Sequence, residues 1–410
     1  MKKLPRMQAL NWTQFLGAFN DNLFKFLTIF MAMEIWGPEN SGSILPIAGA
    51  LSTLPFLIFS DAGGVIADRR SKSDIIKFIK LMEILIMSLG FIGFLIGSPV
   101  FVLITLFMMS AQSAYFGPAK YGIIPELVSA QKLPQANASI SAMTFSAIIL
   151  GTVIASLANK VLPLAVSSFF TILVAVAGYI ISLKIPHVNA VGTDRRISLL
   201  FFNEAWKTLR STMKNRYLYA SIIALSFFWM LGAFIQLEII PFGTTILQVS
   251  KENANHLFLC CSFGIGLGSF IAGRISGEKV KLGLVAWACA GLLASVFILS
   301  RVETVMSSCL SLFGFGLAAG IYCLPLNAYI QWKSPDSSRG KILAAVNFFN
   351  FTGILSAALV MGVFDYIGLD AAQSYLIMSI GLLVFAVIMF VRFPEFYRTY
   401  RMARSRAGRQ

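Results

Sequence analysis

Runs of apolar residues about 20 residues long, or longer, follow one another through nearly the whole chain. An α-helix needs roughly 20 such residues to cross the hydrocarbon core of a bilayer. The chain is 57% hydrophobic and only 12% charged, a composition typical of helical membrane proteins. The sequence therefore predicts an all-α polytopic membrane protein with twelve transmembrane helices, at 9–36, 43–67, 75–97, 99–124, 137–159, 161–184, 217–247, 253–276, 280–300, 303–332, 341–366 and 371–393.

The net charge of +15 is distributed unevenly along the chain. If the N-terminus is cytoplasmic, 28 of the 33 Lys and Arg residues fall in cytoplasmic segments, and only Lys160, Lys251 and Arg301 fall on the opposite side. This asymmetry predicts that both termini lie in the cytoplasm. We expect the basic tail "YRTYRMARSRAGRQ" to contact anionic lipid head groups and no nucleic acid.

Cysteine and histidine give no sign of a disulfide framework, a metal site or an enzyme. All five cysteines fall within predicted spans, where packing is their usual role. His187 and His256 have no ligand-spaced neighbours and begin no H-x₄-D motif, and no Ser or Cys nucleophile has a recognisable base nearby. We therefore expect a protein that is not an enzyme and holds no metal or other cofactor.

The two halves of the chain resemble each other. "LGAFND" (residues 16–21) returns as "LGAFIQ" (231–236), and "GGVIADRRS" (63–71) returns as "GSFIAGRIS" (268–276). A looser match joins "GPAKYGIIPE" to "LPLNAYIQWK". We interpret the chain as a parallel repeat of two six-helix bundles, at 1–184 and 216–396, joined by a cytoplasmic linker at 185–215 and followed by a basic tail at 397–410.

The first predicted span carries a polar stripe that lipid does not satisfy. Gln14, Gly17 or Ala18, Asp21, Lys25 and Thr28 recur at helical spacing on one face. A charged side chain at the bilayer centre costs at least ~2.5–3.5 kcal/mol, so this face should point into the helix bundle. The opposite charges of Asp21 and Lys25 could instead neutralise each other four residues apart.

Further polar residues lie inside other predicted spans, and with the first span they form our candidate substrate site. The predicted site residues are Asp21, Asn22, Lys25, Glu83, Gln112, Tyr115, Lys120, Gln236, Asn327, Gln331 and Asn347, with Glu238 and Asn350 as additional interior positions. Simpler roles stay open for some of them. Glu83 could pair with Lys80, the Lys120 amine could reach the cytoplasmic surface, and Asn327 and Gln331 could only join helices.

A duplication around a long basic loop resembles the major facilitator superfamily, whose halves rock about a central site. The segment "GVIADRRSKSDI" (64–75) resembles that family's signature loop in degraded form, with Ser71 and Ser73 in place of a glycine and a basic residue. The resemblance implies a conformational switch made of Gly64, Asp68, Arg69 and Lys72. Asp68 would face the N-terminus of the helix that begins near Lys341, where amides and the helix dipole favour an anion. A solvated charged turn is the alternative.

Within this superfamily, "QFLGAFNDNLFKF", "SAYFGPAKYGIIPELVSAQKLPQANASI" and "PLNAYIQ" are similar to the bacterial lysophospholipid transporter family. The resemblance implies a flippase of the bacterial inner membrane that returns lysophospholipids to the cytoplasmic leaflet for re-acylation, by alternating access. Since no further segment follows Gln410, we expect any acyltransferase/acyl-carrier-protein synthetase to be a separate partner, and we expect a monomer surrounded by membrane lipids.

The residue types suit this substrate class independently of the resemblance. Carboxylates can bind a head-group ammonium, Lys and amide donors can bind a phosphate, and apolar walls can hold an acyl chain. A coupling cation, Na⁺ or H⁺, or no coupling ion would each fit. Because a fold does not fix the substrate, ion-coupled efflux or uptake of another amphipathic molecule, such as a drug or siderophore, is the alternative.

Overall fold

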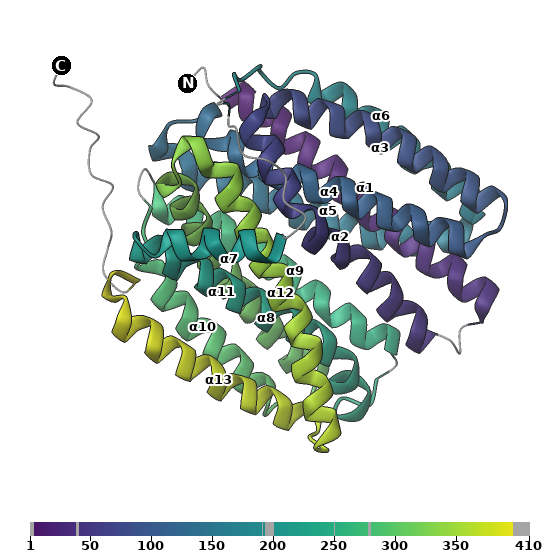
Figure 1. Cartoon of the computed structure of the whole chain (residues 1–410). Helices are drawn as coiled ribbons and strands as arrows, with labels where there is room; N and C mark the ends of the chain where they lie inside the picture. The colour runs from purple at the N-terminus through teal and green to yellow at the C-terminus, as the bar shows by residue number, and fades with distance from the viewer. Residues whose placement is uncertain are drawn as a thin grey trace. The chain divides into compact units, whose positions relative to one another are not determined.

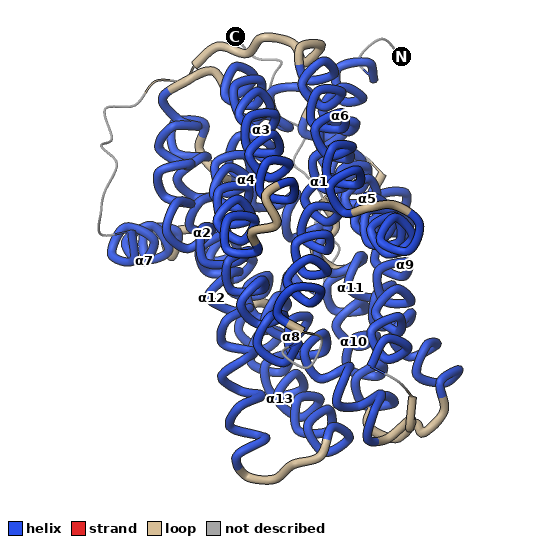
Figure 2. Tube along the Cα trace, turned by 90° about the vertical axis from the view of Figure 1, so that its right-hand side faces the viewer, coloured by secondary structure: helices blue, strands red, loops and turns tan. Residues whose placement is uncertain are grey.

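The computed structural model describes residues 4–37, 41–190, 192, 201–249, 251–277 and 280–396, and these residues form helices joined by short connections (Figure 1). No strand occurs within the described ranges, as the tube in Figure 2 shows. The helices are α1 (Leu4–Trp36), α2 (Ser41–Arg69), α3 (Lys72–Leu95), α4 (Pro99–Leu127), α5 (Leu133–Val161), α6 (Leu164–Ser182), α7 (Phe201–Thr212), α8 (Arg216–Thr245), α9 (Lys251–Ser276), α10 (Leu284–Leu299), α11 (Val305–Lys333), α12 (Arg339–Tyr366) and α13 (Ala371–Arg392).

Each of the twelve predicted spans falls on one of these helices, with α7 as the additional one. By length and composition, ten of the described helices can cross a membrane. The remaining two predicted spans correspond to α10, an apolar helix of 16 residues, and α1, whose middle carries Asn20, Asp21, Asn22 and Lys25. The all-α fold predicted from the sequence is confirmed.

Local sequence explains where several helices begin and end. The Ser71 side chain accepts a hydrogen bond from the amide of Asp74 and so begins α3, and a capping box between Asp370 and Gln373 begins α13. Gly97 adopts a positive φ of 68° in the turn between α3 and α4, a conformation that glycine tolerates best. These signals set the lengths of the helices that carry the site.

The chain divides into two compact units, each with its own set of helix contacts. The first comprises residues 1–127, 143–211 and 334–351, and the second comprises 128–142, 212–333 and 352–410. Each unit takes the first turns of one helix from the other half of the sequence: α12 begins in the first unit, and α5 begins in the second. The basic tail at 397–410 and linker residues 193–200 lie outside the described residues.

Six helix pairs that are in contact in the first unit recur in the second. In the first unit α1 packs against α2, α4 and α6, α4 also packs against α2 and α3, and α3 and α6 run side by side (Figure 1). In the second unit α8 packs against α9, α11 and α13, α11 also packs against α9 and α10, and α10 packs against α13. If α1–α6 correspond in order to α8–α13, every one of these pairs has its counterpart, as a repeat of six helices requires.

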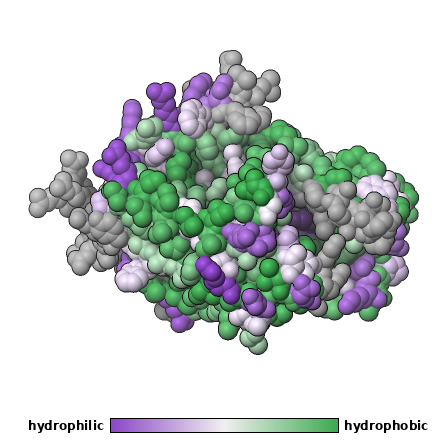
Figure 3. All heavy atoms as spheres, turned by 90° about the horizontal axis from the view of Figure 1, so that it is seen from below, coloured by the Kyte–Doolittle hydropathy of each residue, from purple (hydrophilic) through white to green (hydrophobic). Residues whose placement is uncertain are grey.

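Large apolar side chains on the outer surface fit a protein surrounded by lipid. Trp287 is 81% exposed, Val391 80% and Leu359 74%. The face drawn in Figure 3 is largely hydrophobic, with polar side chains gathered in patches. Such extended apolar surface would favour aggregation in water, whereas lipid covers it without cost.

Candidate functional site

Seven polar side chains of α1, α3 and α4 gather inside the first unit, and we call them the α1–α3–α4 cluster. Ser113 donates to the Asp21 carboxylate at 3.0 Å and contacts the Gln112 side chain at 3.3 Å, and Gln112 donates to the backbone oxygen of Ile79 at 3.1 Å. These bonds join α1 and α3 to α4. The members of the cluster are Asn20, Asp21, Lys80, Glu83, Gln112, Ser113 and Lys120.

Lys80 and Glu83 form the buried ion pair of this cluster. Their side chains are each 2% exposed, with 2.5 Å between Nζ and Oε2, and Asn20 donates to the other Glu83 oxygen at 3.0 Å. The alternative role predicted for Glu83, pairing with Lys80, is therefore confirmed. Glycine at position 17 of α1 leaves room for the Lys80 ammonium, since a Cβ there would collide with it. Gly178 of α6 also lies beside the Lys80 side chain. The pair is neutral as a whole and has its partners within the protein.

Asp21 and Lys120 carry opposite charges that act on each other without forming an ion pair in the described structure. Asp21 is half-buried and its described hydrogen-bond partner is Ser113. Lys120 is 8% exposed, with its ammonium 4.5 Å from the ring centre of Tyr121 and 5.5 Å from that of Phe116. The interpretation that Lys120 reaches the cytoplasmic surface is therefore wrong, because aromatic rings hold its amine inside the unit.

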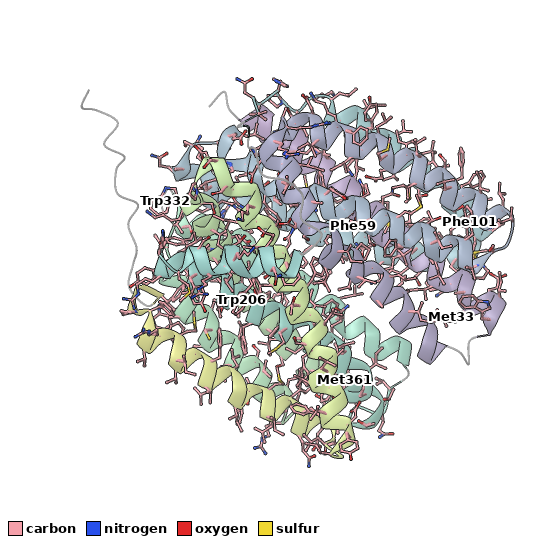
Figure 4. All side chains as sticks on the ribbon, in the orientation of Figure 1. Met33, Phe59, Phe101, Trp206, Trp332 and Met361 are labelled. Atoms are coloured by element: carbon pink, nitrogen blue, oxygen red, sulfur yellow. The ribbon has the colours of Figure 1, made fainter. Side chains whose placement is uncertain are left out.

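The polar neighbours of Asp21 on α1, Asn22 and Lys25, form no described hydrogen bond or ion pair to another helix. Asn22 bonds back to the Ala18 oxygen of its own helix at 2.8 Å, and Lys25 is half-buried with no carboxylate within ion-pair distance among the described residues. The alternative in which Asp21 and Lys25 neutralise each other is therefore wrong. On α4, Tyr115 stacks against Phe59 of α2 with 5.9 Å between the ring centres, so packing holds its ring. Figure 4 labels Phe59.

The candidate residues from the second half of the sequence are divided between the units. Gln236 is exposed, and Asn327 bonds back to the Cys323 oxygen at 3.1 Å. Gln331 is fully buried in the second unit and exchanges two hydrogen bonds with Asn137, at 2.8 and 2.9 Å. This is the helix-joining role that was open for Gln331. Asn347 lies in the first unit against Gly117 of α4.

The signature loop has the geometry that the resemblance implied. Asp68 is 1% exposed and accepts hydrogen bonds from the amides of Gly340 and Lys341, at 2.7 and 2.9 Å, at the start of α12. Gly64 permits this approach, because a Cβ there would collide with Ala344 and the Gly340 oxygen. A solvated turn is therefore the wrong interpretation of Asp68.

The basic residues of the same loop differ from each other. Lys72 is fully buried and pairs with Glu126 of α4 at 2.7 Å, whereas Arg69 is exposed. Their part in switching stays a prediction. The geometry of Asp68 and Lys72 nevertheless anchors the loop to both α4 and α12.

Asn20 and Ser113 were not predicted as site residues, and Lys80 was predicted only as a partner of Glu83. Asn20 precedes Asp21 and lies off the stripe we counted, and Ser113 lies beside Gln112 in an apolar helix. The i, i+3 spacing of Lys80 and Glu83 was the available signal for their pair. Among the described residues, no group of three or more His, Cys, Asp and Glu side chains could hold a metal ion.

A family model described as "Major Facilitator Superfamily" matches residues 11–358. The chain belongs to the Major Facilitator Superfamily. It is therefore a multi-pass membrane transporter and not an enzyme, as the sequence predicted.

Among curated proteins, the chain is similar to the lysophospholipid transporter LplT of Serratia proteamaculans (strain 568), with 28% identity over 370 residues, 88% of this chain and 87% of the relative. The protein of the same name from Escherichia coli O157:H7 (strain EC4115 / EHEC) is 27% identical over 378 residues, 87% of this chain and 89% of the relative. The resemblance to the lysophospholipid transporter family is thus confirmed at modest identity.

Solved structures agree on the fold. The human organic anion transporter MFSD10 superposes with a TM-score of 0.78 at 14% identity, covering 95% of this chain and 99% of that one. A bacterial homologue of the iron transporter ferroportin superposes with a TM-score of 0.73 at 11% identity, covering 95% and 99%. At these identities the likeness concerns the fold alone.

Proposed function

We propose that this transporter moves lysophospholipids across the bacterial inner membrane toward the cytoplasmic leaflet, by alternating access, with both termini in the cytoplasm. The observation that carries the proposal is the separation of two charges inside the first unit. Asp21 and Lys120 are buried or half-buried, act on each other electrostatically and are not paired. A zwitterionic head group carries the complementary charges: its ammonium suits Asp21, and its phosphate suits Lys120.

The other charged residues of the cluster support this assignment, because they bond to one another and leave Asp21 and Lys120 as the charges open to a ligand. Glu83 and Lys80 already form an ion pair, and Asn20 donates a hydrogen bond to the second oxygen of the Glu83 carboxylate. Leaving two opposite charges unpaired in the membrane interior costs stability, since replacing buried ionic groups with apolar residues is often neutral or stabilising. A ligand that brings both opposite charges at once recovers this cost, as lysophosphatidylethanolamine does.

The similarity to relatives named lysophospholipid transporter points to the same substrate class. A lysophospholipid delivered to the cytoplasmic leaflet would be re-acylated there by a separate acyltransferase. The substrate carries a single acyl chain, which the lipid around the helices accommodates while the head group crosses.

The proposal is tested with purified protein reconstituted into vesicles of diacyl phospholipid. Initial rates of entry are compared for lysophosphatidylethanolamine, lysophosphatidylglycerol and an amphipathic drug cation. We expect lysophosphatidylethanolamine to be transported well above protein-free vesicles and the drug cation to remain at background. Transport of the drug cation with no lysophospholipid transport would replace this proposal with the drug or siderophore alternative.

A further inference from the structure

A carboxyl group in the second unit is buried without a hydrogen-bond partner. Glu238 of α8 is 2% exposed, and its Oε2 is buried and meets no donor in the described structure. Tyr375 of α13 is fully buried, and its hydroxyl also has no partner there. Neither residue belongs to the α1–α3–α4 cluster.

The aromatic residues around Glu238 show that it faces Tyr375. Phe234 and Phe242 lie four residues before and after Glu238, on the same face of α8. Both rings pack edge-on against Tyr375, at 6.4 and 5.4 Å between ring centres. Glu238 therefore points from α8 toward α13, and its charge acts on the Tyr375 phenol.

The internal repeat shows that packing does not require a carboxyl group here. The match of residues 16–21 to 231–236 places Glu238 opposite Leu23 of the first half. Leu23 is 3% exposed, so the equivalent position is buried in both units. An apolar side chain fills it in one unit, and an ionisable side chain fills it in the other.

The charged groups around Glu238 are acidic. Those that act on it are Asp365, at the end of α12, and Asp370, which begins α13, and both are exposed. Asp370 already accepts a hydrogen bond from the amide of Gln373 in its capping box. From α9 and α11, which also pack against α8, no described basic side chain acts on this carboxyl group.

We propose that Glu238, together with Tyr375, is a proton-binding site that couples transport to a pH gradient. A proton from water binds a Glu238 oxygen and forms an O–H group, so the negative charge that acts on the Tyr375 phenol is lost. Release breaks the same O–H bond, and no other bond changes. A proton suits this place better than a metal ion, which needs several ligands, and none of the described side chains form such a group. The coupling role rests on the proposed function, whereas proton binding does not.

Proton binding is tested on the purified protein by infrared difference spectroscopy between acidic and alkaline buffer. The wild type should show titrating carboxylic-acid carbonyl absorption, and Glu238→Gln should remove the part of it that Glu238 contributes. Tyr375→Phe should shift its frequency. Glu303→Gln is the matched control, because Glu303 is an exposed carboxylate between α10 and α11. Titrating absorption in Glu238→Gln that equals that of the wild type would overturn the assignment.

Coupling is tested in vesicles with lysophosphatidylethanolamine. With one proton per substrate, a gradient of about one pH unit supports an accumulation of up to about tenfold. Glu238→Gln should lose this accumulation and keep exchange of substrate at equal pH, while Glu303→Gln should keep both. Glu238→Leu, which carries the residue of the equivalent position, should fold and behave in the same way. Gradient-driven accumulation by either Glu238 variant would overturn the coupling role, whereas wild-type protein without lysophospholipid transport would overturn only the proposed function and leave the infrared test decisive.

Discussion

The buried ammonium of Lys120 has no described carboxylate at ion-pair distance to balance its charge, so a ligand would have to supply the anion. It is 8% exposed, has aromatic rings on two sides, and lies beyond ion-pair distance of every described carboxylate. Cation–π contacts are worth ~0.5–2 kcal/mol, less than the several kcal/mol that burying an ammonium costs. A substrate phosphate would supply the missing charge.

We therefore predict that Lys120→Met weakens lysophospholipid binding without lowering stability. The Met side chain keeps the volume and the contact with Phe116 and Tyr121 but loses the charge. Binding should weaken by about 1.5–3 kcal/mol, roughly tenfold to a hundredfold, as for a lost hydrogen bond to a charged group. The check is titration of the detergent-purified protein with lysophosphatidylethanolamine, with melting temperature as the control. Equal affinity in both proteins would remove Lys120 from the site.

Gly17 tests the geometry of the buried pair. A side chain at this position would occupy the space of the Lys80 ammonium. Gly17→Val should separate Lys80 from Glu83, and breaking a buried ion pair typically costs ~3–5 kcal/mol. We expect a clear loss of melting temperature, measured by thermal unfolding in detergent. The same substitution at Gly232, where a Cβ has open space, should be tolerated far better.

At the level of helices, the first turns of α12 and α5 lie in the unit of the opposite half of the sequence. The two contacts use different chemistry. At α12, a carboxylate caps two amides, and at α5, Asn137 and Gln331 exchange two neutral hydrogen bonds. Alternating access would require both contacts to open.

Removing the charge at α12 should favour states in which this contact is open. Contacts between a carboxylate and a helix N-terminus are worth roughly 0.3–2 kcal/mol, so Asp68→Asn should shift populations by a factor of about 2 to 30. The measurement is the maleimide labelling rate of Ala345→Cys, a buried position in α12, in a background without the five native cysteines. Asp74→Asn removes an exposed carboxylate from the same segment as a control. Unchanged labelling in Asp68→Asn would show that Asp68 does not hold the contact closed.

The contact at α5 is suited to a double-mutant cycle. Asn137→Ala should leave the Gln331 amide buried without a partner, at a cost of ~1–3 kcal/mol. The double variant with Gln331→Ala should cost less than the sum of the single variants, with a coupling near ~0.6–1.7 kcal/mol, as found for hydrogen bonds between membrane helices. Melting temperatures of the four proteins provide the measurement. Strict additivity would mean that the two amides do not interact.

At the level of the whole molecule, the fold was predictable because each helix that crosses lipid must be long and apolar. The placement of polar side chains was less predictable. Asn20 and Ser113 are ordinary residues in sequence and become site residues only because α1, α3 and α4 meet. Gln236 is exposed, and its place in the site stays a prediction, because helical periodicity does not say which face of α8 is covered. The signature loop implied the contact of Asp68 with the start of α12, whereas the placement of the first turns of α5 in the second unit depends on tertiary packing that no sequence pattern indicated.

We propose that Asp21 binds the head group of a lysophospholipid, and the rate of lysophosphatidylethanolamine entry into vesicles containing Asp21→Asn tests this role. This change keeps the shape and the hydrogen bond from Ser113 while it removes the charge. The rate should fall at least about tenfold below that of the wild type, because a charge-assisted contact of about 1.4 kcal/mol or more is lost. Expression and melting temperature should stay nearly unchanged. Entry at the wild-type rate, or a loss of activity that only follows misfolding, would contradict this role.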